Sequence, residues 1–223
     1  MICLKTPHVW LLLITPGAGA PAAFHPLPLG SITPKGWLLE QLQLQAEGLS
    51  GHLAQFWPDV MDSAWRGGKG DKGLHERTPY WLNGFLPLAY LLRNANITSL
   101  PGVQGLYHQR TMCAALPRAA ADCKDLPPVK PLEQARAYIA EILKRRKPSG
   151  WLGPDDIADG NMYWAPSVAM LALVQYAELE PTAFADVTQL ILEHLLEMKR
   201  RLSTVALSDV AQNRWVDVCY TVA

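Results

Sequence analysis

The sequence predicts an all-α fold in which apolar helices alternate with amphipathic ones. Apolar residues recur at helical spacing along most of the 223-residue chain. Alternating runs of Val, Ile and Thr between hairpin turns, which would indicate strands, do not occur in the sequence. Three segments open on an aromatic residue and continue as an apolar helix, and their tryptophans are Trp81, Trp164 and Trp215. Together these observations predict a repeated helical architecture.

The first expected helix begins at Trp37, shortly after Pro34, and ends at Gly51. Proline ahead of a first turn and glycine after a last turn are common helix boundaries. A second, mostly apolar helix is expected over residues 81–92. Because Pro87 lies inside this run, the helix is expected to start late or to kink there.

Residues 132–146 predict an amphipathic helix that ends in the basic run Lys144-Arg145-Arg146-Lys147. This run is expected to be a solvated last turn, where cations suit the helix dipole. Residues 166–178 are apolar on nearly all sides, which is typical of a helix buried on both faces. Residues 183–202 are amphipathic again, and residues 213–223 begin another apolar helix. The expected apolar faces of the two amphipathic helices are Leu132, Ala135, Ile139, Ile142 and Leu143 in the first, and Val187, Leu190, Ile191, Leu195 and Met198 in the second.

The three tryptophan-led segments indicate a repeat of about 50 residues, an inner apolar helix followed by an outer amphipathic one. Their tryptophans are 83 and 51 residues apart. Residues 101–130 fit no helix pair, and removing about 25 to 30 of them makes the spacings similar, so an irregular insertion is expected there. Such repeats describe a toroid or a solenoid of helical hairpins, and a closed ring of six hairpins needs roughly 300 residues. Residues 24–223 are therefore expected to form the N-terminal part of an incomplete toroid.

The charge balance excludes some classes of function. The chain has 20 basic and 20 acidic residues, so its formal net charge is zero. Proteins that bind nucleic acids or membrane surfaces need a basic field, and neither partner is expected here. The sequence leaves the oligomeric state open.

The first 23 residues predict a secretory signal peptide. Lys5 is followed by a short apolar stretch at residues 9–14 and by small residues at 18–22. The alternative is an N-terminus with no targeting role. No other apolar run approaches the ~20 residues of a membrane span. The chain is therefore expected to be secreted, and the sequon Asn96-Ile97-Thr98 would then accept a glycan.

The four cysteines fall into different classes. Cys3 would leave with the signal peptide, whereas Cys113 and Cys123 enclose a loop short enough for a local disulfide. Cys219 is expected to be a small core residue. The Cys and His spacings do not match a zinc site, so no metal or other cofactor is expected in this chain.

The stretch DSAWRGGKGDKGLHERTPYWLNGF, residues 62–85, combines aromatic rings with glycines and charged side chains. A phosphate-binding loop is excluded, because the stretch lacks the GK[ST] ending, a preceding strand and an immediate helix. A sugar-binding rim is favoured, since carbohydrates stack their C–H faces on rings and bond their hydroxyls to carboxylates, Arg and His. The candidate substrate-binding residues are Trp65, His75, Glu76, Arg77, Tyr80 and Trp81.

A second stretch, SGWLGPDDIADGNMYW at residues 149–164, again places aromatic and acidic residues before an apolar helix. Its candidate substrate-binding residues are Trp151, Asp155 and Trp164. Two such loops at corresponding positions support a shared carbohydrate pocket. The alternative is that the tryptophans cap the core and the acids are solvated residues at helix N-termini. The residues alone leave both readings open.

Three segments carry a resemblance to a known family: LPLGSITPKGWLLEQLQLQAEGLSGHLAQFWPDV, ERTPYWLNGFLPLAYLL and SGWLGPDD. They resemble the N-terminal half of the catalytic domain of glycoside hydrolase family 127, the β-L-arabinofuranosidase-like family. The similarity runs from about Leu27 to Trp215, with residues 101–130 outside it. It implies an (α/α)6 barrel and a hydrolase that acts on plant or algal polysaccharide and removes L-arabinofuranosyl residues.

The resemblance also implies a catalytic glutamate and a nucleophilic cysteine in a zinc-binding Cys/Glu cluster, both in the later part of the barrel. No residue here matches that cluster, so no catalytic residue is transferred, and this chain alone is expected to be inactive. Glu76 is the one candidate for a catalytic carboxyl, since glycoside hydrolysis commonly uses a carboxyl pair. Two alternatives stay open: another six-hairpin carbohydrate enzyme, such as an unsaturated uronyl hydrolase or a lyase, and an inactive carbohydrate-binding fragment.

Overall fold

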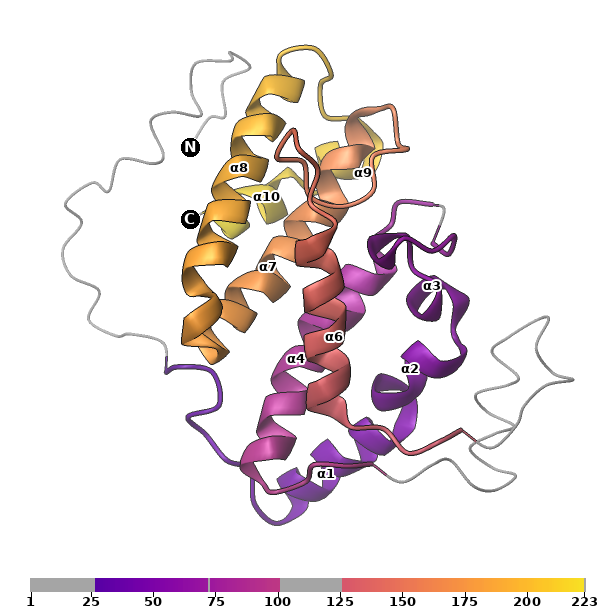
Figure 1. Ribbon diagram of the computed structural model, residues 1–223, viewed down its shortest axis with the longest axis vertical. Helices are drawn as coiled ribbons and strands as arrows, with labels where there is room; N and C mark the ends of the chain where they lie inside the picture. The colour runs from indigo at the N-terminus through magenta and orange to yellow at the C-terminus, as the bar shows by residue number, and fades with distance from the viewer. Residues whose placement is uncertain (1–26, 72, 101–125, 223) are drawn as a thin grey trace, which may run out of the picture.

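The computed structural model describes residues 27–71, 73–100 and 126–222, and within them it is all-α, as predicted (Figure 1). Extended pairing in these residues is limited to two isolated bridges, one of which joins Ser63 to Gly70. The α-helices are α1 (Trp37–Gln45), α2 (Gly51–Phe56), α3 (Pro58–Met61), α4 (Arg77–Asn94), α6 (Pro131–Lys144), α7 (Trp164–Leu179), α8 (Phe184–Leu202), α9 (Asp209–Asn213) and α10 (Trp215–Val222).

The N-terminal helix does not end at Gly51, so that prediction was wrong. A π-helical turn, Ala46–Ser50, follows α1, and α2 then begins at Gly51 itself. The break lies at Gly48, whose φ of −91° and ψ of −141° are not helical. Glycine tolerates this conformation at little cost, and the chain therefore kinks there before continuing.

Helix α4 starts earlier than predicted and runs through Pro87. Its first turn holds Pro79, where a missing N–H costs nothing because the first amides of a helix have no intrahelical partner. Pro87 removes the bond that would reach the carbonyl of Asn83. Gln175 of α7 donates its side-chain amide to that carbonyl at 3.4 Å and also to the Asn83 side chain. A neighbouring helix thus satisfies the group that the proline leaves free.

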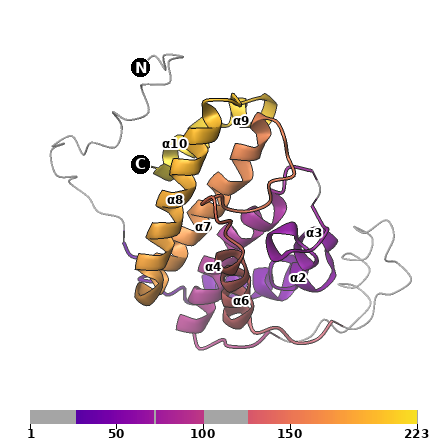
Figure 2. The same cartoon turned by 45° about the horizontal axis from the view of Figure 1, so that its top comes forward.

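The helices that carry the three repeated tryptophans lie next to one another. Helix α7 packs against α4 on one side and against α10 on the other. The amphipathic helices cover this row, α6 against α4 and α8 against α7 (Figures 1 and 2). The arrangement follows the predicted alternation of inner apolar and outer amphipathic helices within the described residues.

The core is formed where α4, α6 and α7 meet. Leu86 and Tyr90 of α4, Ile139 of α6, and Met170 and Leu173 of α7 are fully buried there. Each buried apolar side chain of this size contributes about 1.5–3 kcal/mol by leaving water. The expected faces of the outer helices are also confirmed: Ala135, Ile139, Ile142, Val187, Leu190 and Met198 are buried, and Leu132, Leu143, Ile191 and Leu195 are partly buried against the core.

Several sequence predictions fall on residues outside the described ranges. These are the signal peptide at residues 1–23 and the pair Cys113 and Cys123 within the expected insertion. Leu100, which precedes the expected insertion, and Val129, near its end, form an antiparallel bridge with N···O distances of 2.7 and 3.1 Å, and both side chains are buried. The chain therefore leaves and re-enters the helical core at adjacent points.

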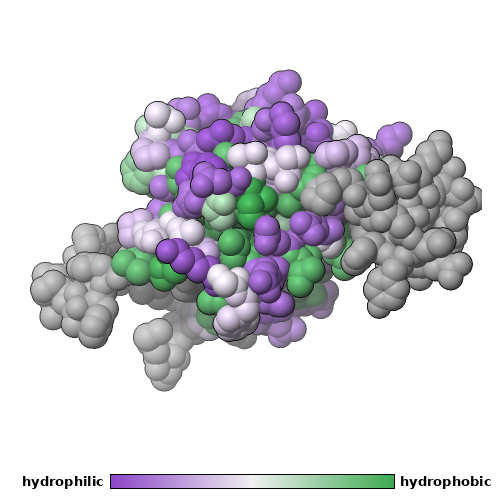
Figure 3. All heavy atoms as spheres, turned by 90° about the horizontal axis from the view of Figure 1, so that it is seen from below, coloured by the Kyte–Doolittle hydropathy of each residue, from purple (hydrophilic) through white to green (hydrophobic). Residues whose placement is uncertain are grey.

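Helix α1 is the least covered of the longer helices, with no buried residue. Trp37, Leu38 and Leu44 are exposed along it. The end of the molecule where α1 lies in Figure 1 has hydrophobic residues at its surface among hydrophilic ones (Figure 3). Among the described residues no helix is both long and apolar enough to cross a membrane.

Candidate functional site

The glycine-rich loop after α3 is a tightly packed turn. The carboxylate of Asp62 accepts the backbone amide of Lys69 at 3.1 Å, and Asp59 accepts that of Asp71 at 2.9 Å. A Cβ on Gly68 would lie 2.1 Å from the carbonyl oxygen of Asp62, so only glycine fits there. Since the protein's own carboxylates occupy these amides, the loop does not present them to a phosphate.

Trp65 anchors this loop in the interior. Its indole Nε1 donates to the carbonyl of His75 at 2.7 Å, and its side chain is almost wholly buried. The turn that carries it, Ala64–Arg66, is capped by Ser63, whose hydroxyl accepts the amide of Trp65 at 3.3 Å. Ser63 also accepts a hydrogen bond from Thr78 of α4 at 2.7 Å, which fixes the loop to the start of that helix.

The two predicted aromatic–acidic loops contact each other. His75 is buried, and its Nε2 lies 2.7 Å from a carboxylate oxygen of Asp156 in the second loop. A Cβ on Gly153 would lie 2.4 Å from the indole ring of Trp65, and Gly153 has a φ of +87°. The second loop therefore needs glycine to pass over the tryptophan of the first.

Arg77, the first residue of α4, binds two carboxylates. Its guanidinium Nη1 lies 3.0 Å from Asp59 and 3.1 Å from Asp71, and its backbone amide donates to Asp71 at 2.8 Å. Asp71 therefore acts as the cap of α4 from outside the helix. Burial raises the pKa of the Asp71 carboxyl, and the hydrogen bond from the Arg77 amide opposes that rise.

A pocket of about 520 Å³ opens where the N-terminal ends of α4, α7 and α10 meet the side of α2. It contains aromatic rings from three helical segments, one carboxylate and two guanidinium groups. Its lining residues are Leu53, Trp57, Glu76, Arg77, Tyr80, Trp81, Trp164 and Arg214. Five of the nine predicted substrate-binding residues thus line a single pocket.

Two polar atoms on the wall of this pocket have no partner among the described residues. They are Oε2 of Glu76 and Nε1 of Trp164, and both atoms are inaccessible to solvent. Trp164 as a whole is only 7% exposed. Buried polar groups are almost always hydrogen-bonded, because an unpaired one loses its bonds to water without replacement. Glu76 therefore brings an unsatisfied acceptor to this site, whereas the Trp164 side chain also interacts with the phenol of Tyr80.

Tyr80 lines the same pocket and contacts Trp164. Its ring meets that of Trp164 edge to face, with centroids 5.8 Å apart and planes at 72°. Burial raises the pKa of the Tyr80 phenol, and the positive charge of Arg214 acts against that rise. The ring is nevertheless 43% exposed, so one side of it remains accessible to a ligand.

Trp81 forms the inner wall of the pocket and is held on several sides. Its ring stacks on Phe85 at a centroid distance of 4.7 Å and meets Tyr138 edge to face at the same distance. Its Nε1 donates to the carbonyl of Ser50 at 2.9 Å. Trp81 therefore serves as a fixed apolar surface, and its hydrogen-bonding capacity is already used.

The other four predicted residues do not line the pocket. Trp65 and His75 are buried beneath it, in the contacts already described. Trp151 is fully buried in a separate cluster, where its Nε1 donates to Pro154 and Arg201 covers its ring at 4.0 Å. Asp155 is exposed and pairs with Lys147 at 3.0 Å. For the two tryptophans, Trp65 and Trp151, the core-capping alternative describes the observed surroundings.

Sequence reasoning did not identify Arg214 as a pocket residue. Arg214 directly precedes Trp215, the third repeated tryptophan, and its guanidinium lies 5.6 Å from the centre of the Trp164 ring. The repeat itself contained the signal, because Glu76, Trp164 and Arg214 all stand at the start of an inner helix. Residues at equivalent ends of neighbouring helices converge.

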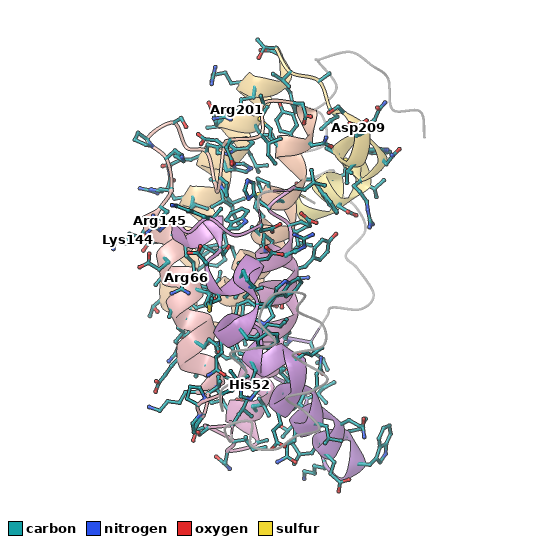
Figure 4. All side chains as sticks on the ribbon, turned by 90° about the vertical axis from the view of Figure 1, so that its right-hand side faces the viewer. His52, Arg66, Lys144, Arg145, Arg201 and Asp209 are labelled. Atoms are coloured by element: carbon teal, nitrogen blue, oxygen red, sulfur yellow. The ribbon has the colours of Figure 1, made fainter. Side chains whose placement is uncertain are left out.

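The basic run that ends α6 is a solvated, ion-paired helix end, as expected. Arg145 lies 3.2 Å from Glu141, and Arg146 lies 3.4 Å from Glu193. Figure 4 shows Arg66, Lys144 and Arg145 on the same side of the molecule. None of these three cations lines the pocket: Lys144 and Arg145 pair with Glu141, and Arg66 lies over the ring of Tyr138.

Among the described residues no three His, Cys, Asp or Glu side chains are close enough together to hold a metal ion. Cys219 lies half-buried on α10. Comparisons of the chain with protein-family models, curated proteins and solved structures found no match. The pocket's own geometry therefore supplies the argument for function.

Proposed function

We propose that this pocket binds a sugar unit and that the chain is the carbohydrate-binding part of a glycoside hydrolase-like protein. The proposed substrate is plant or algal polysaccharide, with L-arabinofuranosyl residues as the units recognised. The observation that carries the proposal is an aromatic pocket whose lining includes Glu76, a carboxylate with one oxygen, Oε2, that has no hydrogen-bond partner among the described residues.

A sugar hydroxyl suits both this oxygen and the indole of Trp164, because it donates one hydrogen bond and accepts others. A hydroxyl facing Glu76 would donate to the carboxylate, and one facing Trp164 would accept from the indole. The exposed side of Tyr80 and the ring of Trp57 would take the apolar C–H face of the same sugar. The pocket thus offers the two kinds of contact that carbohydrates require.

The proposal includes an (α/α)6 architecture and secretion. The row formed by α4, α7 and α10, covered by α6 and α8, supports a series of helical hairpins with a common open end. In such a toroid the loops at that end surround the substrate. Asn96 is exposed directly after α4, where a glycan would meet no steric obstacle from the core.

The pocket lining includes a single carboxylate, that of Glu76. Hydrolysis of a glycosidic bond commonly needs two carboxyl groups on opposite sides of the bond. Asp59 and Asp71 are committed to Arg77 and lie outside the lining. We therefore propose that Glu76 orients the sugar, and that this chain alone binds without turnover.

Two substitutions test the proposal. The Kd of methyl β-L-arabinofuranoside and of its oligosaccharides would be measured by calorimetry for the wild type, Glu76→Gln and Trp164→Phe. Losing a hydrogen bond to a charged group should weaken binding about tenfold or more in Glu76→Gln. Trp164→Phe keeps an aromatic ring but removes the N–H donor and part of the ring surface, so a smaller loss than in Glu76→Gln is expected.

The matched control is Asp155→Asn, which neutralises an exposed carboxylate outside the pocket. It should leave the Kd unchanged, and thermal unfolding would show that all three variants are folded. Binding that is absent from the folded wild type, or equally strong in the wild type and Glu76→Gln, would overturn the proposal.

A further inference from the structure

The two arginines that line the pocket have acidic partners, whereas the carboxylate of Glu76 has no basic partner among the described residues. We infer that the pocket selects sugars by charge: a sugar bearing an ammonium group binds more tightly than its neutral analogue, and a sugar acid binds more weakly. This inference rests on the proposed function and specifies the substrate class of the same site.

The positive charge of Arg77 is already neutralised. Its guanidinium bridges Asp59 and Asp71, at 3.0 and 3.1 Å. The Asp71 side chain is completely buried in this contact. An incoming carboxylate would therefore have to compete with two fixed carboxylates for the same guanidinium.

Arg214 also has an acidic neighbour. Its Nη1 lies 3.8 Å from Asp217, one turn further along. Its guanidinium also lies over the ring of Trp164, so one aromatic face already has a cation close to it. Neither arginine of the lining therefore carries an unbalanced positive charge.

Glu76 has no such balance. Among the described residues no Lys, Arg or His lies within ion-pairing distance of its carboxylate, and its Oε2 is buried without a partner. The exposed side of Tyr80 adds the electron-rich face of an aromatic ring, which also attracts cations. The pocket thus presents one uncompensated negative charge beside aromatic rings.

An ammonium group on the sugar would ion-pair with Glu76 and donate hydrogen bonds to it. A carboxylate there would be repelled by Glu76 and would find both arginines already paired. The charge pattern therefore disfavours uronic acids, and with them the unsaturated uronyl hydrolase or lyase that the sequence left open. It favours neutral and amino sugars.

Three arabinofuranosides that differ only at C5 test the inference: the methyl glycoside itself, its 5-amino-5-deoxy analogue and its 5-uronate. Two unit charges about 4 Å apart in water change a Kd about fivefold, so each step in the series should be at least that large at low salt. Raising the salt to about 1 M should reduce the differences in Kd among the three sugars, because the partly exposed charges are then screened.

The Glu76→Gln variant should bind all three sugars with nearly equal affinity, whereas the control Asp155→Asn should keep the full order. If the neutral sugar binds but the three affinities are equal, or the uronate binds most tightly, the charge inference fails and the proposed function stands. If none of the three binds the folded protein, both fail.

Discussion

His194 shows how one buried residue couples this fold to pH. It lies on α8 with no exposed surface, and its Nδ1 accepts the backbone amide of Leu152 at 3.0 Å. Burial lowers its pKa to about 4, and the charge of Arg201 acts in the same direction, while Glu197 opposes it. Protonation would place a hydrogen on Nδ1 and break the bond to Leu152.

The stability of the protein should therefore fall between pH 6.5 and pH 4. In this window the histidine is protonated in the unfolded state but stays neutral in the folded state. The unfolded state therefore binds more protons, and the free energy of unfolding declines as the pH falls. The loss reaches about 3 kcal/mol, at about 1.4 kcal/mol for each pKa unit between 6.5 and 4.

Urea unfolding at a series of pH values measures this loss. In His194→Asn the side-chain oxygen can still accept from Leu152 but does not titrate, so this contribution should disappear. If the free energy of unfolding changes with pH equally in the wild type and in the variant across this window, the assignment to His194 is wrong.

The site could be predicted in part from the residues. Trp65 and Trp164 stand in similar sequence surroundings, each in an aromatic and acidic stretch before an inner helix. The indole of Trp65 lies in the interior because its N–H donates to the carbonyl of His75 and because Gly153, which has no side chain, leaves room for the ring. The contact with Gly153 joins residues 88 positions apart, which local spacing does not contain.

At the scale of the elements, Gln175 of α7 replaces a hydrogen bond that Pro87 removes from α4. Pro87 leaves the carbonyl of Asn83 without its helical partner, and Gln175 of α7 supplies a donor. The sequence predicted a late start or a kink at this proline, because the compensating group lies 92 residues from Asn83 in the chain. Local sequence rules therefore identify the hydrogen bond that Pro87 removes but not the side chain from α7 that replaces it.

Gln175→Leu should destabilise the fold by about 1 kcal/mol, since it leaves partly buried acceptors on Asn83 unpaired. The cost should shrink by about 0.5–1 kcal/mol in a Pro87→Ala background, where the restored amide at position 87 serves the Asn83 carbonyl. Urea denaturation of the four proteins in this cycle measures the coupling.

Gln189→Leu is the control for this cycle, because Gln189 is exposed on α8 and should tolerate the change within about 0.5 kcal/mol. Strict additivity between positions 87 and 175 would show that Gln175 does not replace the missing helical bond.

The helices themselves were largely predictable. Periodicity placed α6, α7 and α8 to within a few residues, since long apolar stripes dominate the choice of structure there. The boundary at Gly51 failed because two glycines lie close together, and the one that breaks the helix is Gly48. Composition alone does not distinguish a glycine that kinks a helix from one that continues it.

At the scale of the whole molecule, the recurring tryptophan-led helices explain why distant residues share one pocket. Helices α4, α7 and α10 lie side by side, so Glu76, Trp164 and Arg214 at their starts converge although 138 positions separate the first from the last. A row of equivalent helix starts builds a site from residues that no local motif connects.

The central claim is that a sugar occupies this pocket, and a crystal structure with methyl β-L-arabinofuranoside tests it most directly. The account predicts a sugar against Tyr80, with one hydroxyl about 3 Å from the carboxylate of Glu76. A sugar bound at another surface of the protein, with the pocket empty at saturating ligand, would contradict it.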